Sequence, residues 1–203
     1  MHYTFAFKKD KNCPTFIDGV IHEFYQEGIY DEPMEQNWHY AGPDEILAKL
    51  PEKLVLITKD KCYGFDFCTD FGGHIVSEAF LKEFKTLKIG RWEVAELAIV
   101  NPKGISMDAL RYFFIRQRRE DQASSTVIDL ERSNIQFRKT GEIKSINSLF
   151  IKDDAGLDVF SIDEVSLLGF VFLSEKAADV LNRLGLKGVE IVDTGGIGSV
   201  KSA

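Results

Sequence analysis

The stretch FLSEKAADVLNRLGLKGVEIV, residues 172–192, predicts a strand, a short helix and a second strand in succession. Ser174 suits the helix start because its hydroxyl oxygen can accept a hydrogen bond from a backbone N–H, and Glu175 favours the positive end of the helix dipole. Apolar residues then recur at helical spacing, namely Ala177, Val180, Leu181 and Leu184. Gly185 and Gly188 can turn the chain into an apolar strand. We recognise no nucleophile, base or metal ligand in the stretch, which indicates a structural role.

A second stretch, HIVSEAFLKEFKTLKIGRWEVAELAIV at residues 74–100, repeats this order. Its Ser-Glu pair at residues 77–78 corresponds to the pair at residues 174–175, and a similar apolar stripe follows, formed by Phe80, Leu81, Phe84 and Leu87. Gly90 lies where a left-handed C-cap is needed, as Gly185 does. We interpret the two stretches as one strand–helix–strand unit used twice. Two unrelated capped helices are the alternative, because such caps are common and the spacing after them differs.

The rest of the chain mixes short strands and helices, which indicates an α+β fold with a mixed, largely antiparallel sheet. Hydrophobic patterns predict strands at residues 1–8, 53–58, 61–71, 142–154 and 157–164, the last of these a short strand or a turn, and an alternating segment that ends in a turn at residues 125–137. Helices are predicted at residues 42–50 and from Met107, where a strand over residues 112–115 competes, and a hairpin turn is predicted at residues 153–156. We expect a single domain over residues 1–203, with a possible division into an acidic N-terminal lobe, 1–100, and a C-terminal lobe, 101–203.

Composition indicates a cytoplasmic globular protein. The chain has 203 residues, of which 44% are hydrophobic, and no apolar run approaches the length of a membrane span. Residues 1–14 contain no apolar core typical of a secretory signal. The cysteines at positions 13, 62 and 68 are too few and too odd in number for a disulfide framework. We therefore expect a reduced compartment and no membrane partner.

The net charge of −7 is concentrated in one stretch of the sequence. Residues 18–52 contain nine acidic residues and one basic residue, Lys49, so that this stretch carries −8 while the remainder of the chain carries +1. Such a surface repels nucleic acid and steers basic partners, although it can equally serve solubility. Trp38 lies inside this stretch, where it is either a partly exposed interface anchor or a locally packed side chain.

No catalytic, cofactor or metal site is predicted. The four histidines lack a second His at helical spacing, and five residues separate Cys62 from Cys68, too many for a zinc knuckle. In a strand the two cysteines would share a face, and we expect both to be buried. A nucleophile pair of Cys68 and His74 is the remaining enzymatic alternative.

Two further motifs invite a functional reading that we reject. The glycine-rich sequence DTGGIGS at residues 193–199 resembles a phosphate loop, but only four residues follow it, so no helix can open there and a frayed tail is expected. The run RQRRE at residues 116–120 is basic, but acidic residues follow it directly. We interpret it as a solvated helix end or a turn and not as a nucleic-acid site.

The C-terminal half contains motifs that resemble a bacterial family of immunity proteins of polymorphic toxin systems, once filed as a domain of unknown function. The matching positions are an Asp-Leu-x-x-Ser motif in a strand (Asp129, Leu130, Ser133), the segment Asp158, Val159 and Phe160, and a Ser-Glu-capped helix that ends in a glycine turn (Gly185, Gly188, Val189). The helix with the Ser-Glu pair at 77–78 resembles the family's first such helix. The resemblance covers roughly residues 77–192.

The resemblance implies a protein that binds a cognate bacterial toxin and blocks it, without catalysis and without a cofactor. A cytoplasmic location implies a toxin that acts there, and many such toxins, nucleases above all, are basic. The acidic stretch is outside the resemblance, and we expect it to contribute the toxin contact through Asp31, Glu32, Glu35, Trp38, Asp44 and Glu45. The alternatives are a general protein-binding adaptor without a toxin and, less favoured, an enzyme with a site near Cys68 and His74. The sequence does not define the toxin, the blocking geometry or the oligomeric state.

Overall fold

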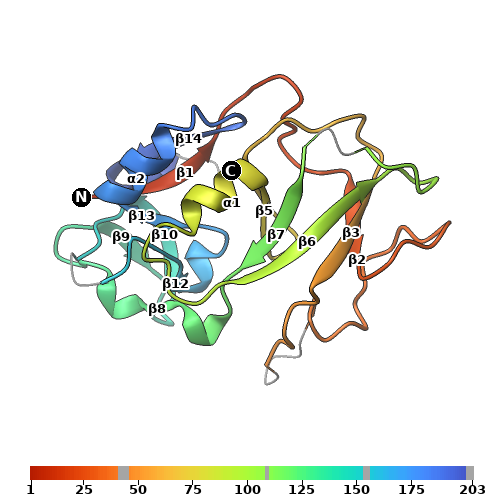
Figure 1. Ribbon diagram of the computed structural model, residues 1–203. Helices are drawn as coiled ribbons and strands as arrows, with labels where there is room; N and C mark the ends of the chain where they lie inside the picture. The colour runs from red at the N-terminus through yellow and green to blue at the C-terminus, as the bar shows by residue number, and fades with distance from the viewer. Residues whose placement is uncertain (41–45, 108–109, 153–155, 200–203) are drawn as a thin grey trace.

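The fold is α+β and contains two main sheets joined by a shared core, as the computed structural model shows (Figure 1). The structure describes residues 1–40, 46–107, 110–152 and 156–199. The six-stranded sheet has the spatial order β2 (Gly19–His22), β3 (Lys53–Thr58), β6 (Glu93–Val100), β7 (Tyr112–Arg116), β5 (Gly73–Ser77) and β4 (Phe67–Asp70). The four-stranded sheet has the order β11 (Val159–Phe160), β13 (Phe172–Ser174), β1 (His2–Phe7) and β14 (Val189–Asp193).

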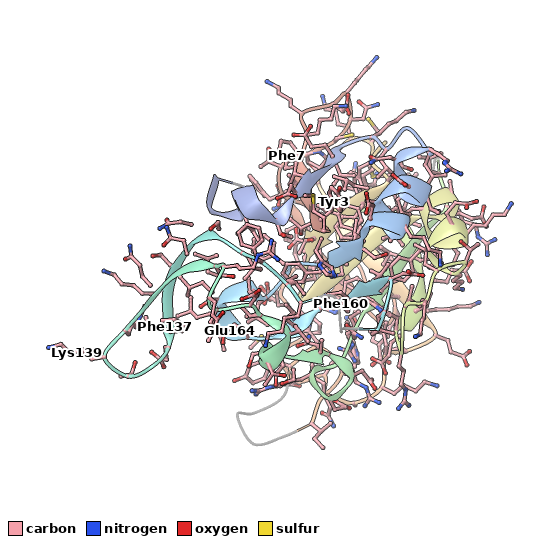
Figure 2. All side chains as sticks on the ribbon, turned by 90° about the vertical axis from the view of Figure 1, so that its left-hand side faces the viewer. Tyr3, Phe7, Phe137, Lys139, Phe160 and Glu164 are labelled. Atoms are coloured by element: carbon pink, nitrogen blue, oxygen red, sulfur yellow. The ribbon has the colours of Figure 1, made fainter. Side chains whose placement is uncertain are left out.

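The pairing is mixed and largely antiparallel, as the sequence predicts. In the two main sheets all neighbours are antiparallel except β3 and β6. The remaining strands form two small sheets. In one, β9 (Asn134–Phe137) pairs in antiparallel with β10 (Ile143–Ser148), and in the other, β8 (Ala123–Ser124) pairs in parallel with β12 (Ile162–Asp163). The β9–β10 hairpin stands out from the body with Lys139 at its tip (Figure 2). The short 3-10 helices are η1 (Arg119–Asp121), η2 (Ser125–Val127), η4 (Val165–Leu167) and η5 (Thr194–Ser199).

The six-stranded sheet is covered on both faces. One face, with Leu56, Leu97 and Phe114, packs against side chains of the loops between residues 13 and 50. The other face packs against α1 (Glu78–Phe84), α2 (Glu175–Asn182) and the four-stranded sheet. The sheets do not separate at residue 100, because β1 joins the second sheet and β7 joins the first. None of the helices in the described part of the chain is long and apolar enough to cross a membrane.

The two strand–helix–strand units are present, as β5–α1–β6 and β13–α2–β14. Ser77 accepts a hydrogen bond from the N–H of Phe80 at 3.2 Å, and Ser174 accepts one from the N–H of Ala177 at 3.2 Å. Both serines are therefore N-caps, as their position in the sequence predicts. Gly90 has a φ of +65° and Gly185 a φ of +64°, the left-handed conformation that favours glycine.

The first unit is completed by a residue of the second. The Ser77 hydroxyl donates to Asp66 Oδ1 at 2.7 Å, and Asp66 Oδ2 accepts from the backbone N–H of Lys187 at 2.9 Å. The backbone N–H of Asp66 donates in return to the carbonyl of Lys187 at 3.0 Å. Because Lys187 follows α2, the segment after the helix of the second unit is hydrogen-bonded to the residue that binds the N-cap of the first unit.

The second unit repeats this arrangement with the roles exchanged. The Ser174 hydroxyl donates to Asp158 Oδ1 at 3.2 Å, and Asp158 Oδ2 accepts from the backbone N–H of Lys88 at 2.9 Å. The N–H of Asp158 donates to the carbonyl of Lys88 at 2.7 Å. The two units are thus related by a pseudo-twofold arrangement in which α1 and α2 lie side by side (Figure 1).

Several predicted elements differ in the structure. Residues 112–116 form a strand and not part of a helix from Met107, because β5 and β6 pair with both edges of β7. Residues 46–50 contain no helix, although one is predicted at 42–50, and residues 61–66 contain no strand. Residues 194–199 form η5 and not a frayed tail: Ile197 is buried, and the Thr194 hydroxyl donates to the carbonyl of His2 at 3.2 Å. Of the hairpin turn predicted at 153–156, residues 153–155 lie outside the described part of the chain.

Candidate functional site

The acidic stretch crosses one face of the six-stranded sheet with β2 as its regular element. Its described carboxylate residues are all exposed, namely Asp18, Glu23, Glu27, Asp31, Glu32, Glu35 and Glu52. Apolar side chains of the same stretch point the other way and pack on the sheet, among them Ile21, Trp38 and Leu50. The stretch is therefore a layer with an apolar inner side and an acidic outer side.

Trp38 anchors the acidic stretch on the sheet through its buried side chain. Its side chain is only 5% exposed and belongs to the core on this face of the sheet. Of the two interpretations of Trp38 from sequence, the structure therefore shows a locally packed side chain and not a partly exposed interface anchor. The indole Nε1–H donates to Glu23 Oε1 at 2.8 Å. Trp38 therefore positions an acidic side chain at the surface and does not itself present a contact surface.

Arg116, at the end of β7, is the second tether. Its guanidinium forms an ion pair with Glu93 at 2.9 Å, donates to the carbonyl of Trp38, and donates to the carbonyl of Ala48 at 2.6 Å. Arg116 is 5% exposed and Gln117 is 8% exposed, so the expectation of a solvated RQRRE run is wrong for its first two residues. A buried arginine fixed to two carbonyls joins the acidic layer to the sheet at two points.

The outer side of the layer contains a hollow of about 420 Å³, named the acidic hollow from here on. Its lining residues are His22, Glu23, Phe24, Ile29, Asp31, Glu32, Pro33, Met34, Glu35 and Gln36. Three of the predicted contact residues, Asp31, Glu32 and Glu35, thus come together with Glu23 around one depression. The exposed side chains of Phe24 and Met34 add apolar surface beside them. The other two predicted acids, Asp44 and Glu45, lie outside the described residues.

The charge of the acidic hollow is nearly uncompensated. Within the described ranges of the chain, no Lys or Arg forms an ion pair with its four carboxylates; His39 Nε2 lies 3.8 Å from Glu32 Oε2. Burial lowers the pKa of His39, and the nearby Glu32 opposes this shift without cancelling it. His39 is therefore mainly neutral near pH 7, and the hollow presents negative charge beside apolar surface.

The Cys68 and His74 pair does not form in this structure. On the β4–β5 ladder Cys68 is opposite Ile75 and Thr69 is opposite His74, so the side chains of Cys68 and His74 point to opposite faces of the sheet. Burial raises the pKa of the Cys68 thiol to about 12, with Asp70 and Cys13 adding to the rise. Burial lowers the pKa of His74 to about 3. The position of the two side chains rules out a direct hydrogen bond between them, and both pKa shifts disfavour a thiolate–imidazolium pair.

The remaining cysteines and histidines form no metal site in the part of the chain that the structure describes. All three cysteines are free thiols. Cys13 and Cys68 are buried as expected for Cys68, but Cys62 is exposed because residues 61–66 leave the sheet before β4 begins. The expectation that Cys62 and Cys68 share a buried face is therefore wrong.

Comparison with known proteins places the chain in a family. The model of the family Imm43, described as Immunity protein 43, matches residues 6–197. The chain belongs to the Immunity protein 43 family. No curated protein matches the chain. The match to Immunity protein 43 confirms the resemblance to immunity proteins and extends it over the acidic layer, which the sequence motifs alone do not cover.

Proposed function

We propose that this member of the Immunity protein 43 family binds and neutralises a cognate bacterial toxin that acts in the cytoplasm. The observation that carries the proposal is the family match over residues 6–197. An immunity protein needs affinity and not turnover, so a chain without a recognisable catalytic set suits this function. The placement of Cys68 and His74 on opposite faces of the sheet gives no support to the enzymatic alternative at these two residues.

We propose that the acidic hollow contributes the toxin contact. Its carboxylates Asp31, Glu32 and Glu35 are exposed, clustered and without a Lys or Arg partner in the described structure. A negative patch of this kind raises the association rate of a basic partner and orients it, and basic nucleases are the toxin class that fits. Phe24 and Met34 would pack against the apolar stems of incoming Lys or Arg side chains. Trp38 would act indirectly, by holding Glu23 in place.

A rescue assay tests the immunity function. The product of the neighbouring gene is expressed in the cytoplasm of a naive host with and without this chain, and the pair is purified by affinity capture of one partner. Growth restored by co-expression, together with a stable complex, supports the proposal. Toxicity that is not relieved, with no complex, would return the chain to the adaptor alternative, in which no toxin is involved.

A charge reversal tests the contact surface separately. Asp31→Lys, Glu32→Lys and Glu35→Lys are combined, and the matched control combines Glu131→Lys, Asp179→Lys and Glu190→Lys, which are also exposed acids but lie elsewhere. At low salt the first variant should associate with the toxin about 10-fold or more slowly, with a weaker salt dependence, and the control should not. Equal rates for both variants at low salt would contradict the contact and leave the immunity function in place.

A further inference from the structure

A second pocket lies away from the acidic hollow, between the edge of the six-stranded sheet and the segments around β12 and η4. It has a volume of about 320 Å³ and is lined by the β4–β5 turn, the end of β7, the residues around β12 and the loop after η4. Phe71 at the β4–β5 turn has a φ of +54°, which is uncommon for a residue other than glycine, Asn or Asp. The volume is within the range of small-molecule sites, at its lower end.

His74 presents an unpartnered nitrogen to this pocket. The side chain is 5% exposed, and its Nδ1 lies 3.0 Å from the Thr69 hydroxyl. Because that hydroxyl donates to the carbonyl of Gly169 at 3.4 Å, it accepts from the Nδ1–H of His74, and Nε2 keeps its lone pair. Nε2 has no hydrogen-bond partner among the described residues, and His74 is one of the residues that line the pocket.

Ser161 presents a second unpartnered group. The residue is 8% exposed, and its backbone is fully used: the N–H donates to Gln117 Oε1 at 2.9 Å, and the carbonyl accepts from the N–H of Ala123 at 2.9 Å. Its hydroxyl has no hydrogen-bond partner within the described ranges, and Ser161 also lines the pocket. Two polar side chains that are more than nine-tenths buried thus lack partners at one cavity, which is rare in a folded protein.

The charged groups that line the pocket are already compensated. Arg116 is paired with Glu93 at 2.9 Å, and the Asp70 carboxylate accepts from the N–H groups of Ile17 at 3.2 Å and Phe71 at 2.8 Å. An anionic ligand would find no unpaired cation here. His74 adds no charge at neutral pH, because burial holds its pKa far below the usual value.

We propose that this pocket binds a small uncharged molecule through neighbouring hydroxyl groups. A hydroxyl can donate to His74 Nε2 and can both donate to and accept from the Ser161 hydroxyl, so a pair of adjacent hydroxyls satisfies both groups. The Gln122 side chain is a third polar contact on the same wall. Such a hydroxyl pair occurs in a monosaccharide and in the ribose of a nucleoside. The site is independent of the proposed toxin contact and would stand if that contact were disproved.

The test is ligand-observed NMR on the full chain with two arms of probes. One arm uses glucose, galactose and ribose, and the other uses adenosine, guanosine and their 2′,3′-dideoxy analogues. The variants are Ser161→Ala and His74→Phe, and the matched control is Ser166→Ala, whose serine lies on η4 outside the pocket. Circular dichroism and the melting temperature establish that each variant is folded.

Saturable binding of at least one hydroxylated probe, weakened about 10-fold or more by Ser161→Ala and unchanged by Ser166→Ala, would support the site. Binding of a nucleoside but not of its dideoxy analogue assigns the ribose, and binding of free sugars alone assigns a monosaccharide. If no probe binds, if the dideoxy analogues bind as tightly as the nucleosides, or if folded Ser161→Ala binds as well as the parent chain, the proposal is overturned. His74→Phe gives an independent check should Ser161→Ala fail to fold.

Discussion

Asp66 Oδ2 accepts a hydrogen bond from the backbone N–H of Lys187, 2.9 Å away and 121 residues further along the chain. The same bond recurs between Asp158 and the N–H of Lys88. Each aspartate also accepts from the serine that caps the helix of its own unit. Each of the two carboxylates therefore connects the start of the helix in its own unit with the segment that follows the helix of the other unit. Neither unit has its full set of hydrogen bonds without the other.

Removal of either cap serine should weaken the fold by a similar amount. Ser77→Ala and Ser174→Ala each delete an acceptor for a helix N–H, and each should lower the free energy of unfolding by about 1 kcal/mol. Urea unfolding measures this, and Ser145→Ala, which removes a hydroxyl without a described hydrogen bond on β10, should change stability by less than about 0.5 kcal/mol. The proposed toxin contact should be unaffected by either cap variant, and a loss of toxin binding at unchanged stability would show that the caps do more than support the fold.

Removal of the aspartates should cost more than removal of the serines. Asp66→Ala leaves both the Ser77 hydroxyl and the Lys187 N–H without a partner, and each unsatisfied group can cost about 1–3 kcal/mol when buried. Ser77 is 3% exposed whereas Lys187 is exposed, so we expect most of the cost to come from the Ser77 hydroxyl. Asp158→Ala should lower the free energy of unfolding by a similar amount. A much smaller effect of either variant on urea unfolding would show that the two aspartates do not contribute equally to stability.

Arg116 should be essential for holding the acidic layer on the sheet. Arg116→Met leaves Glu93 buried with a weaker partner, Arg118 at 3.4 Å, and removal of one member of such a pair typically costs about 3–5 kcal/mol. In a Trp92→Phe background, the fluorescence of Trp38 should shift to longer wavelength as its surroundings admit water.

The control for this variant is Arg111→Met, since Arg111 forms its ion pairs with Glu78 and Glu96 at the exposed surface. It should leave both the stability and the emission of Trp38 nearly unchanged. If Arg116→Met behaved in the same way, the tether role would be wrong.

His74 should make the fold less stable in acid. Its pKa is about 3 in the native state, whereas the unfolded chain binds a proton near pH 6.5, so the unfolded state holds more protons between these values. Stability contributed by the neutral histidine is present above pH 6.5 and is lost as pH falls, by up to about 1.4 kcal/mol per pH unit. In His74→Phe the slope of unfolding free energy between pH 6 and 4.5 should decrease by that amount. An identical slope in both proteins would show that His74 is not buried in its neutral form.

The thiols should differ in reactivity according to their burial. Cys62 is exposed, while burial raises the pKa of both Cys13 and Cys68. A disulfide reagent at pH 8 should label one thiol per native chain rapidly and all three in denaturant. In Cys62→Ser the rapid phase should disappear. Rapid labelling of a second thiol would contradict the burial of Cys13 or of Cys68.

Sequence reasoning predicts the repeated units well because capping and amphipathic periodicity are local properties. Ser77, Ser174 and the glycines after each helix have their roles within a few residues of sequence. The sequence does not predict the role of Asp66 and Asp158, because the backbone N–H that each aspartate accepts is 121 residues away for Asp66 and 70 residues away for Asp158. A signal was present: Gly-Phe-Asp-Phe at residues 64–67 and Gly-Leu-Asp-Val at residues 156–159 precede the two units in the same way.

The parts that the sequence mispredicts are those decided by tertiary contacts. Residues 112–116 have the composition of a helix or a strand, and the open edges of β5 and β6 make them a strand. The acidic layer lacks a periodic sequence pattern, and no local pattern predicts that the distant Arg116 donates to two of its carbonyls, those of Trp38 and Ala48. Trp38 is ambiguous from sequence since both a core residue and an interface anchor can sit among carboxylates. The family, by contrast, is predicted from motifs in the C-terminal half, which the match over residues 6–197 includes.

The position of β1 between β13 and β14 sets the moment at which a new molecule can finish folding. Thr4 pairs with Phe172 on one side and with Val192 on the other. During synthesis residues 2–7 leave the ribosome long before the strands that flank them, at residues 172–174 and 189–193. The second sheet therefore cannot close until residue 193 has been made, and a translation product that stalls before residue 172 contains neither neighbour of β1. For a protein proposed to protect its own cell, protection would begin only after both of these strands have been made and paired with β1.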